Sequence, residues 1–322
     1  MRCTALAAPL LIAALGAPCC AQDGGADTLR IPLVPASTTM VTAWDVPQNP
    51  LTDSLLGASP RAAQIRRGYR LFVRTADAAP HTAANRLACG NCHLNAGQRE
   101  RALPLAGVAG VFPEYNKREG RVFSLEDRIV GCFMRSENAT AIRADTPSGD
   151  RIRTYPDTSA EEVAALAAYI RWISEGARGR NTLPWRGQNT IPGDSLIPVD
   201  RLDPLRGKKL FREHCSSCHG PDGQGVQIGD KRAGPLWGPR SWNDGAGAAR
   251  VYTLAGFIRF AMPYLDPGRL SAEEAQQIAR FIDSMPRPVY PLKRYDYLRT
   301  RVPTDAVYYK RGAPERPPLK DP

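Results

Sequence analysis

Two copies of one short motif constrain this chain more than any other feature: Cys89-Gly-Asn-Cys92-His93 and Cys215-Ser-Ser-Cys218-His219. On a helical turn the two cysteines share a face and the histidine lies beside them. This is the attachment motif of a c-type haem, in which the thiols become thioethers and the imidazole binds the iron. We therefore predict two covalently bound haem c groups, attached through the four cysteines, with the two histidines as iron ligands.

A four-cysteine zinc site and a redox disulfide are the alternatives for these cysteines. Zinc does not require a histidine directly after each cysteine pair. A redox motif of the thioredoxin type requires a βαβ context, which the sequence lacks. Haem attachment accounts for both motifs, including their histidines.

The first residues predict export. Arg2 is followed by an apolar run over residues 5–17 and then by small residues, a pattern typical of a signal peptide over residues 1–21. Lipidation of Cys19 is the alternative, although Ala-Pro before it is a poor context. No later run is long and apolar enough to cross a membrane, so we expect a periplasmic protein that does not span one.

Cysteine usage singles out one further residue. The chain has 8 cysteines, of which three fall in the predicted signal peptide and four in the haem motifs. Cys132 is left alone in a chain predicted to be exported, where an odd cysteine needs a partner or a function.

The formal net charge of +11 favours anionic substrates or an acidic partner. Nucleic acid is excluded as a partner class, because no nucleic-acid-binding motif accompanies the charge.

An internal repeat predicts the architecture. Arg67-Gly68 with Phe72 matches Arg206-Gly207 with Phe211 ahead of each haem motif, and later the segments that begin at Ser159 and Ser271 match. Each of these serines is followed by glutamate three residues on, which predicts a capping box before a helix. Each unit therefore has an N-terminal helix, a haem motif, a loop region and a C-terminal helix, an order that resembles the class I cytochrome c fold.

We thus expect a mainly α chain with two class I cytochrome c-like domains in tandem. The predicted segments are a signal peptide (1–21), an irregular N-terminal segment (22–50), a first, catalytic domain (51–178), a linker (179–200), a second, electron-transfer domain (201–286) and a basic Pro/Tyr-rich tail (287–322). We expect the tail to pack across the domains, with a basic docking surface as the alternative.

Each iron is expected to have a second protein ligand on the side opposite its histidine. Met262 lies shortly before the predicted last helix, where this fold places its methionine ligand, and methionine raises the reduction potential. A core role is the alternative for Met262. In the first unit the candidates are Cys132, Met134 and Lys117.

Residues 125–136 favour Cys132 among these candidates. They read as a helix capped by Ser124 with Asp127 at the third position. Arg128, Cys132 and Ser136 then lie on one face, whereas Met134 points elsewhere. A guanidinium beside a cysteine favours a thiolate and binds oxyanions, although a buried, inert cysteine remains the alternative.

These residues resemble the TsdA-type dihaem thiosulfate dehydrogenases over residues 60–285. The similarity is carried by Cys89 to Gly97, by Lys117 to Ser136, by the second haem motif and by Met262-Pro263. Its most specific part is the pattern Arg128-x-x-x-Cys132-x-x-x-Ser136. Members of this family join two thiosulfate ions into tetrathionate, and many run the reverse reaction.

The resemblance implies roles for individual residues. It implies His93 and Cys132 as ligands of a catalytic haem, His219 and Met262 as ligands of the second haem, and a substrate pocket lined by Arg118, Arg128 and Ser136. Electrons would pass from the first haem to the second and then to an external acceptor such as a cytochrome. Some members have a competing lysine beside the methionine, where this chain has Ala261.

Two other functions fit the haem motifs. A dihaem electron carrier needs the same repeat but normally uses methionine or histidine on both irons. A Sox-type cytochrome also uses a cysteine-ligated haem, but it loads sulfur onto a carrier protein. Cys132 argues against the first of these.

Overall fold

The computed structural model describes residues 33–37, 40–79, 83–139, 141–143, 152–154, 157–176, 183–229 and 231–310. The predicted mainly α fold is confirmed, because the described strands are short antiparallel pairs. The predicted signal peptide lies outside the described residues. No helix within the described ranges is both long enough and apolar enough to cross a membrane.

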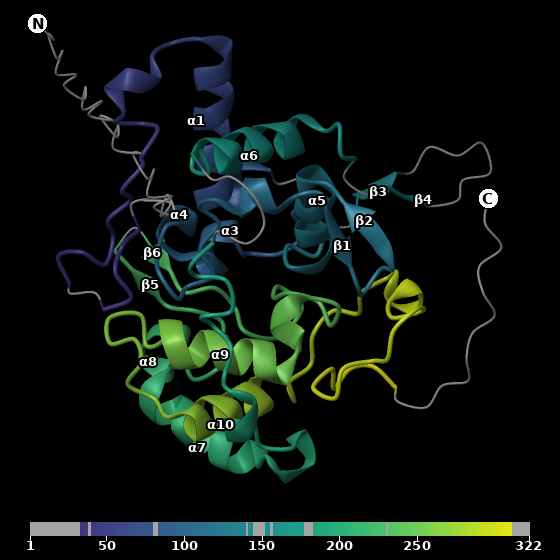
Figure 1. Ribbon diagram of the computed structural model, residues 1–322. Coiled ribbons are helices and arrows are strands. Elements are labelled where there is room, and N and C mark those ends of the chain that lie inside the picture. Colours follow the sequence, from purple (N-terminus) through teal and green to yellow (C-terminus); the bar gives the residue numbers. More distant parts are fainter. Residues whose placement is uncertain are drawn as a thin grey trace, which may run out of the picture.

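The first domain packs its helices around one apolar core (Figure 1). Its helices are α1 (Pro60–Val73), α2 (Thr75–Ala78), α3 (Cys89–Cys92), α4 (Leu94–Gly97), α5 (Leu125–Arg135) and α6 (Glu161–Trp172). Its strand pairs are β1 (Glu114–Asn116) with β2 (Arg121–Phe123) and β3 (Ala141–Arg143) with β4 (Ile152–Thr154). Short 3₁₀ turns lie at Ser54–Leu56 and Val108–Val111. Phe72, Phe133 and Tyr169 are fully buried in this core.

The second domain repeats the plan with fewer insertions and occupies the lower part of Figure 1. Its helices are α7 (Pro204–His214), α8 (Ser216–His219), α9 (Val251–Ala261) and α10 (Ala272–Ile282), and its strand pair is β5 (Gln227–Ile228) with β6 (Lys231–Arg232). Its 3₁₀ turns are Gly193–Ser195, Val199–Arg201 and Gly247–Ala249, with Lys293–Tyr295 in the tail. Phe211, Trp237 and Phe281 form its aromatic centre.

The repeat is visible in how the first and last helices of each domain cross. A Cβ on Gly68 of α1 would lie 2.0 Å from the carbonyl oxygen of Ala165 on α6. A Cβ on Gly207 of α7 would lie 2.0 Å from the carbonyl oxygen of Gln277 on α10. Only glycine allows the two backbones to approach this closely, so the matched glycines set the same crossing in both domains.

The predicted helix caps have different outcomes. Ser271 caps α10 in a capping box with Glu274, as predicted. The matching prediction at Ser159 is wrong, because α6 has Ala160 as its N-cap without a side-chain bond. The backbone N–H of Ser159 instead donates to Asp157 Oδ1 at 2.8 Å, so an aspartate-stabilised turn precedes the helix.

The segments on either side of the second domain are packed against it. In the described part of the predicted linker, Leu183 and Trp185 pack with Val111 of the first domain, whereas Leu196 and Val199 pack on the second core. This segment therefore runs along both domains rather than free of them.

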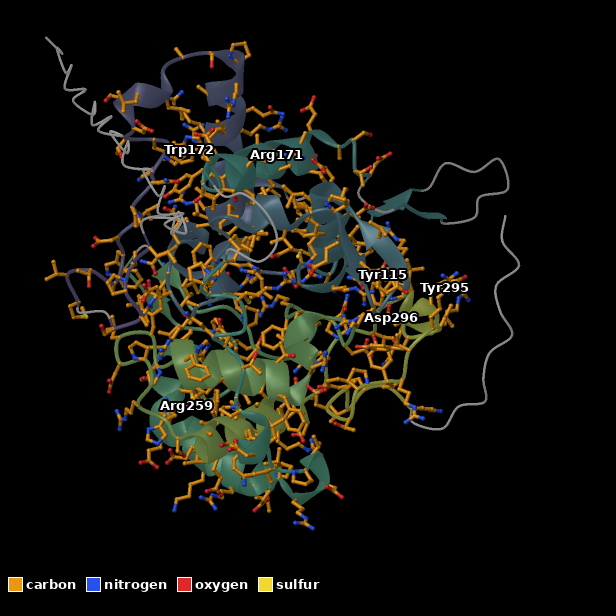
Figure 2. The ribbon with its side chains drawn as sticks, in the orientation of Figure 1. Tyr115, Arg171, Trp172, Arg259, Tyr295 and Asp296 are labelled. Carbon is orange, nitrogen blue, oxygen red and sulfur yellow. The ribbon has the colours of Figure 1, made fainter. Side chains whose placement is uncertain are left out.

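Residues 287–310 of the tail lie across both domains, which is the arrangement the sequence favoured. Asp305 accepts from Arg250 at 2.8 Å in the second domain. Earlier in the tail, Tyr295 and Asp296 lie near Tyr115 of β1 in the first domain (Figure 2). Residues 287–310 are therefore part of the folded body.

The helix crossings generate a prediction about stability. Gly68→Ala or Gly207→Ala would force the crossing helices apart, because the added methyl meets backbone rather than a movable side chain. We expect each to lower the free energy of unfolding by about 1–3 kcal/mol, the usual cost of overpacking. Chemical denaturation measures this. Gly247→Ala is the control, because nothing lies within 4 Å of its Cβ. If all three variants were equally stable, the close backbone approach at these glycines would be contradicted.

Candidate active site and haem sites

The first haem motif is held as one helical turn beside the end of α1. The N–H of Cys89 donates to Thr75 Oγ1 at 3.1 Å, and Thr75 Oγ1 donates to the carbonyl of Leu71 at 2.7 Å. Helix α3 spans Cys89 to Cys92, and the N–H of His93 closes the turn on the Cys89 carbonyl at 2.9 Å. The threonine thus fixes the turn that presents both thiols.

The ring of His93 is oriented by one hydrogen bond. Its Nδ1–H donates to the carbonyl of Leu103 at 2.6 Å, which leaves Nε2 with its lone pair available to a metal. Burial lowers the pKa of the imidazole below its ordinary value, and the nearby Arg128 guanidinium also lowers it, against the effect of the hydrogen bond. These effects favour the neutral imidazole, which is the form that binds iron.

The thiols of the motif are partly buried, as is that of Cys132. Burial is the main cause that raises the pKa of Cys89 well above its ordinary value and that of Cys92 to about 12. The Glu137 carboxyl and, more weakly, Cys132 act in the same direction on both thiols. Cys132 is therefore within electrostatic range of the haem-attaching pair.

Helix α5, which carries Cys132, forms where the sequence predicted a helix. Ser124 and Asp127 form the capping box that starts the helix. The helix ends at Ser136, whose N–H donates to the Cys132 carbonyl at 2.7 Å. The Ser136 carbonyl in turn accepts from Asn85 Nδ2 at 2.6 Å. Both ends of the helix are thus fixed, and Cys132 is half-buried on it.

The other two ligand candidates of the first unit lie elsewhere. Met134 is buried at 4% exposure, and its carbonyl accepts from Asn243 Nδ2 of the second domain at 2.8 Å. Lys117 is exposed, and its carbonyl accepts from the Thr300 hydroxyl at 3.1 Å. No described contact brings either one to the first haem motif.

The two candidate substrate arginines occupy different settings. Arg128 is exposed on α5 and lies close enough to His93 to affect its pKa, as described above. Arg118 follows β1, and its guanidinium donates to the carbonyl of Gly245. The Arg118 guanidinium also lies 5.7 Å from the ring centre of Tyr297. Arg118 therefore lies at the boundary between the two domains and the tail.

The second haem motif follows α7 without an intervening segment. Cys215 ends α7, burial raises its pKa to about 12, and Cys218 is exposed. His219 is partly buried, and its Nδ1 faces the carbonyl of Gly234 at 3.4 Å. Burial lowers the pKa of this imidazole below its ordinary value. Met262 immediately follows α9 and is partly buried.

Both motifs fit a covalent haem c. Each presents two thiols and one neutral imidazole whose Nδ1 is directed at a backbone carbonyl, which is the donor set that this cofactor requires. Among the described residues no group of three or more histidine, cysteine or acidic side chains is arranged to hold a metal ion.

The first motif also contacts the loop that faces the histidine of the second motif. Asn91, between the cysteines of the first motif, donates from Nδ2 to the carbonyl of Arg232 on β6 at 3.2 Å. Two residues on, a Cβ on Gly234 would lie 2.3 Å from Leu87, just ahead of the first motif. Because Gly234 also faces His219, the haem-binding segments of the two domains share a contact.

Comparisons with known proteins identify the family. The SoxA/TsdA cytochrome c domain family matches residues 79–178, and the cbb3-type cytochrome c oxidase subunit III family matches residues 203–282. The thiosulfate dehydrogenase of Allochromatium vinosum is 37% identical over 246 residues, which are 74% of this chain and 82% of the relative. The chain belongs to the thiosulfate dehydrogenase family.

Other members extend this similarity. The thiosulfate dehydrogenase of Psychrobacter arcticus is 35% identical over 76% of this chain and 69% of the relative. The solved thiosulfate dehydrogenase TsdBA from Marichromatium purpuratum, in its as-isolated form, is 36% identical with a TM-score of 0.65. The match covers 78% of this chain and 51% of that protein, so this chain spans about half its length. Two tandem cytochrome c domains, and haem c as their covalent cofactor, are thereby established.

Three buried charged residues near these segments were not predicted from the sequence. Glu137, directly after α5, is 3% exposed, and burial raises the pKa of its carboxyl to about 8. Arg99 is fully buried, and Arg135 is 5% exposed. No periodicity marks them, because each is buried by contacts with distant segments. Their neighbours in the sequence are mostly polar, so no local signal distinguishes them from surface charges.

Arg135 joins the end of α5 to the tail. Its guanidinium donates to both carboxylate oxygens of Asp296 at 2.7 and 2.8 Å and to Glu119 at 3.0 Å. It also donates to the Gly245 carbonyl at 3.0 Å and lies 4.0 Å from the ring centre of Tyr290. One buried cation thus connects the end of α5 with the second domain and the tail.

This network generates a prediction. Asp296→Ala should lower the free energy of unfolding by about 3–5 kcal/mol, because it leaves the buried Arg135 guanidinium without its main partner. The matched control is Glu114→Ala, which breaks a surface pair with Arg186 and should cost less than about 1 kcal/mol. Denaturant titration of the two variants and the parent compares them. Equal losses would show that the Arg135 pair is no more important than a surface contact.

Proposed function

We propose that this chain is an exported dihaem cytochrome that oxidises two thiosulfate ions to one tetrathionate, a reaction the same site also runs in reverse. The observation that carries this proposal is the position of Cys132. Its thiol lies within electrostatic range of Cys89 and Cys92, and Arg128 lies one turn earlier on the same helix.

Each proposed haem has a complete set of protein ligands. The first would be held by Cys89, Cys92, His93 and Cys132, and the second by Cys215, Cys218, His219 and Met262. The bound haems supply the one-electron acceptors for the oxidation, with a low potential where the ligand is a thiolate and a higher one where it is methionine.

Thiosulfate is a dianion with a soft terminal sulfur, and the chain offers groups for both ends. Arg128 on α5 and Arg118 after β1 donate charge-assisted hydrogen bonds to the sulfonate oxygens. The Ser136 hydroxyl, one turn after Cys132, donates another. These contacts leave the terminal sulfur directed at the Cys132 sulfur.

The chemical step is a two-electron oxidation at sulfur. The Cys132 thiolate and the terminal sulfur of thiosulfate lose one electron each and form an S–S bond, which gives Cys132 Sγ–S–SO₃⁻. A second thiosulfate attacks the outer sulfur of this adduct, breaks the new bond and leaves as tetrathionate. The thiolate is regenerated, no proton is transferred, and two electrons have left the sulfur atoms.

The proposed location and partners follow from the sequence. The signal-like residues 1–21 support export to the periplasm. The net charge of +11 supports an anionic substrate and an acidic redox partner, of which an acceptor cytochrome is the expected class. The electrons leave from the second domain, where Cys218 of the haem motif is exposed.

The two other functions are not favoured. A dihaem carrier has no need of an arginine-flanked cysteine near the first haem motif. A sulfur-loading cytochrome of the Sox type needs a carrier protein and releases no free tetrathionate, whereas four relatives with 31–37% identity are thiosulfate dehydrogenases.

Cys132→Met tests the mechanism. The variant should still carry two haems by mass spectrometry, and its first haem should be easier to reduce, because a neutral thioether replaces a thiolate. It should form no tetrathionate, since a thioether cannot make the sulfur adduct. Redox titration beside a thiosulfate-dependent assay with an artificial acceptor measures both properties.

Met134→Leu is the control for this variant, because Met134 is buried beside Cys132 in sequence and has no proposed chemical role. It should turn over at close to the parent rate. Tetrathionate formation by Cys132→Met at the parent rate would falsify the covalent mechanism. Absence of thiosulfate-dependent reduction in the parent protein would reject the proposed activity itself.

The substrate arginines give a second test. Arg118→Ala and Arg128→Ala should each lower kcat/KM at least about tenfold, because a hydrogen bond to a charged group contributes about 1.5–3 kcal/mol. The spectra of both haems should stay unchanged, since no iron ligand is altered. Arg171→Ala, which breaks a surface pair with Glu126 on α5, is the control and should retain the parent kinetics. Parent kinetics in both substrate variants would remove these arginines from the site.

A further inference from the structure

The turn that carries Met262 lies against the first domain. Leu94, Ala102 and Ala261 form a buried apolar cluster, and Met262 and Tyr264 pack against it. Leu94 directly follows His93, and Ala102 directly precedes Leu103, whose carbonyl holds the His93 ring. The proposed ligand of the second haem therefore contacts the segment that orients the ligand of the first.

Arg99 holds this turn from within that segment. Its guanidinium is fully buried and donates from Nη2 to the carbonyl of Tyr264 at 2.8 Å. The same guanidinium lies 4.6 Å from the centre of the Tyr264 ring. A buried cation that binds both the backbone and the ring of one residue restrains it strongly. Tyr264 lies only two residues after Met262.

The N-terminal segment holds Tyr264 as well. Its hydroxyl donates to the carbonyl of Ala43, and its ring stacks on Trp44 at 4.9 Å between centroids. The Ala43 carbonyl also accepts from Asn95 Nδ2 at 2.9 Å, and Asn95 follows His93 by two residues. Tyr264 is therefore restrained at its backbone, its ring and its hydroxyl, in each case by residues outside the second domain.

Arg99 is itself fixed to the core of the first domain. Its neighbour Gln98 is fully buried and donates from Nε2 to the Tyr169 hydroxyl of α6 at 3.1 Å. The backbone on either side pairs with the N-terminal segment, since the Val34 N–H donates to the Gln98 carbonyl at 2.8 Å. The restraint on the turn thus originates in the helix crossing of the first domain.

We propose that Arg99 is a positioning residue for the second haem, and that it holds the Met262–Tyr264 turn so that Met262 stays bound to the iron. The inference rests on the proposed ligand set and not on the substrate. A methionine thioether is a neutral, soft ligand, so its retention depends on how firmly its turn is held. The residue before it, Ala261, has no donor atom that could replace it.

Arg99→Met tests this on the full chain with both haems bound. Methionine keeps much of the volume but removes the donors and the charge. A charge-assisted hydrogen bond of this kind shifts an equilibrium about tenfold or more, so the ratio of methionine-bound to methionine-free second haem should fall by that factor. We expect a weaker methionine–iron absorption band and a lower reduction potential for the second haem, with the first haem unchanged.

Two further variants keep the test decisive. Arg99→Lys retains the charge and one set of donors, so it should restore most of the band even if Arg99→Met is recovered poorly. Arg250→Met removes a guanidinium that pairs with Asp305 in the second domain, away from the Met262 turn. It should lower stability while the band and the potential stay at the parent values.

Three outcomes would overturn the proposal. They are an unchanged band in Arg99→Met, an equal loss of the band in Arg250→Met, and absence of a methionine band in the parent protein. Neither the band nor the potential requires thiosulfate. A failure here is therefore distinct from a failure of the proposed activity, which the turnover assay reports.

Discussion

The crossing of the first and last helices is the contact on which each domain depends. Gly68 and Gly207 let backbone meet backbone, and the haem motif then follows the first helix of each pair. In the second domain Cys215 is the residue that ends α7, so the crossing sets the position of the motif directly. In the first domain Thr75 performs the connection by binding the N–H of Cys89. A core of this size is completed by its haem.

The two domains differ in what lies between the shared helices. Between the haem motif and the last helix, the first domain has two strand pairs and α5, whereas the second has one strand pair and α9. The longer segment of the first domain carries Arg118, Arg128 and Cys132. It also faces the second domain, since Arg118 and Arg135 both donate to the carbonyl of Gly245. The segment that carries the candidate substrate residues therefore also forms part of the domain boundary.

The sequence predicted the features that local pattern determines. The haem motifs, the helix repeat and the capping box of α5 depend on residues within a few positions of each other, and the structure contains the repeat and the cap as predicted. The cap at Ser159 failed for a local reason as well, because Asp157 competes for its N–H. The pattern of serine and glutamate alone did not include that competitor.

The residues that sequence reasoning missed share a different property. Arg135 meets Asp296 across 161 positions, and Arg99 meets Tyr264 across 165. Glu137 is also buried, and it lies just after α5, beyond the sequence pattern that predicts this helix. Such pairs follow from how complete domains pack, so no window of sequence contains both partners. Only a full set of coordinates places them.

These distant pairs answer a physical requirement of one-electron transfer between two sites. The separation and orientation of the sites must be constant, and a linker rich in glycine and proline cannot provide that. Asn91 on Arg232, Arg99 on Tyr264 and Arg135 on Asp296 cross between segments that the linker or the tail separates. Each pair uses a buried or partly buried hydrogen bond rather than apolar contact alone, and hydrogen bonds fix direction as well as distance. These contacts between the folded domains therefore fix the relative position of the haem motifs. The segments that join the domains adapt to that position.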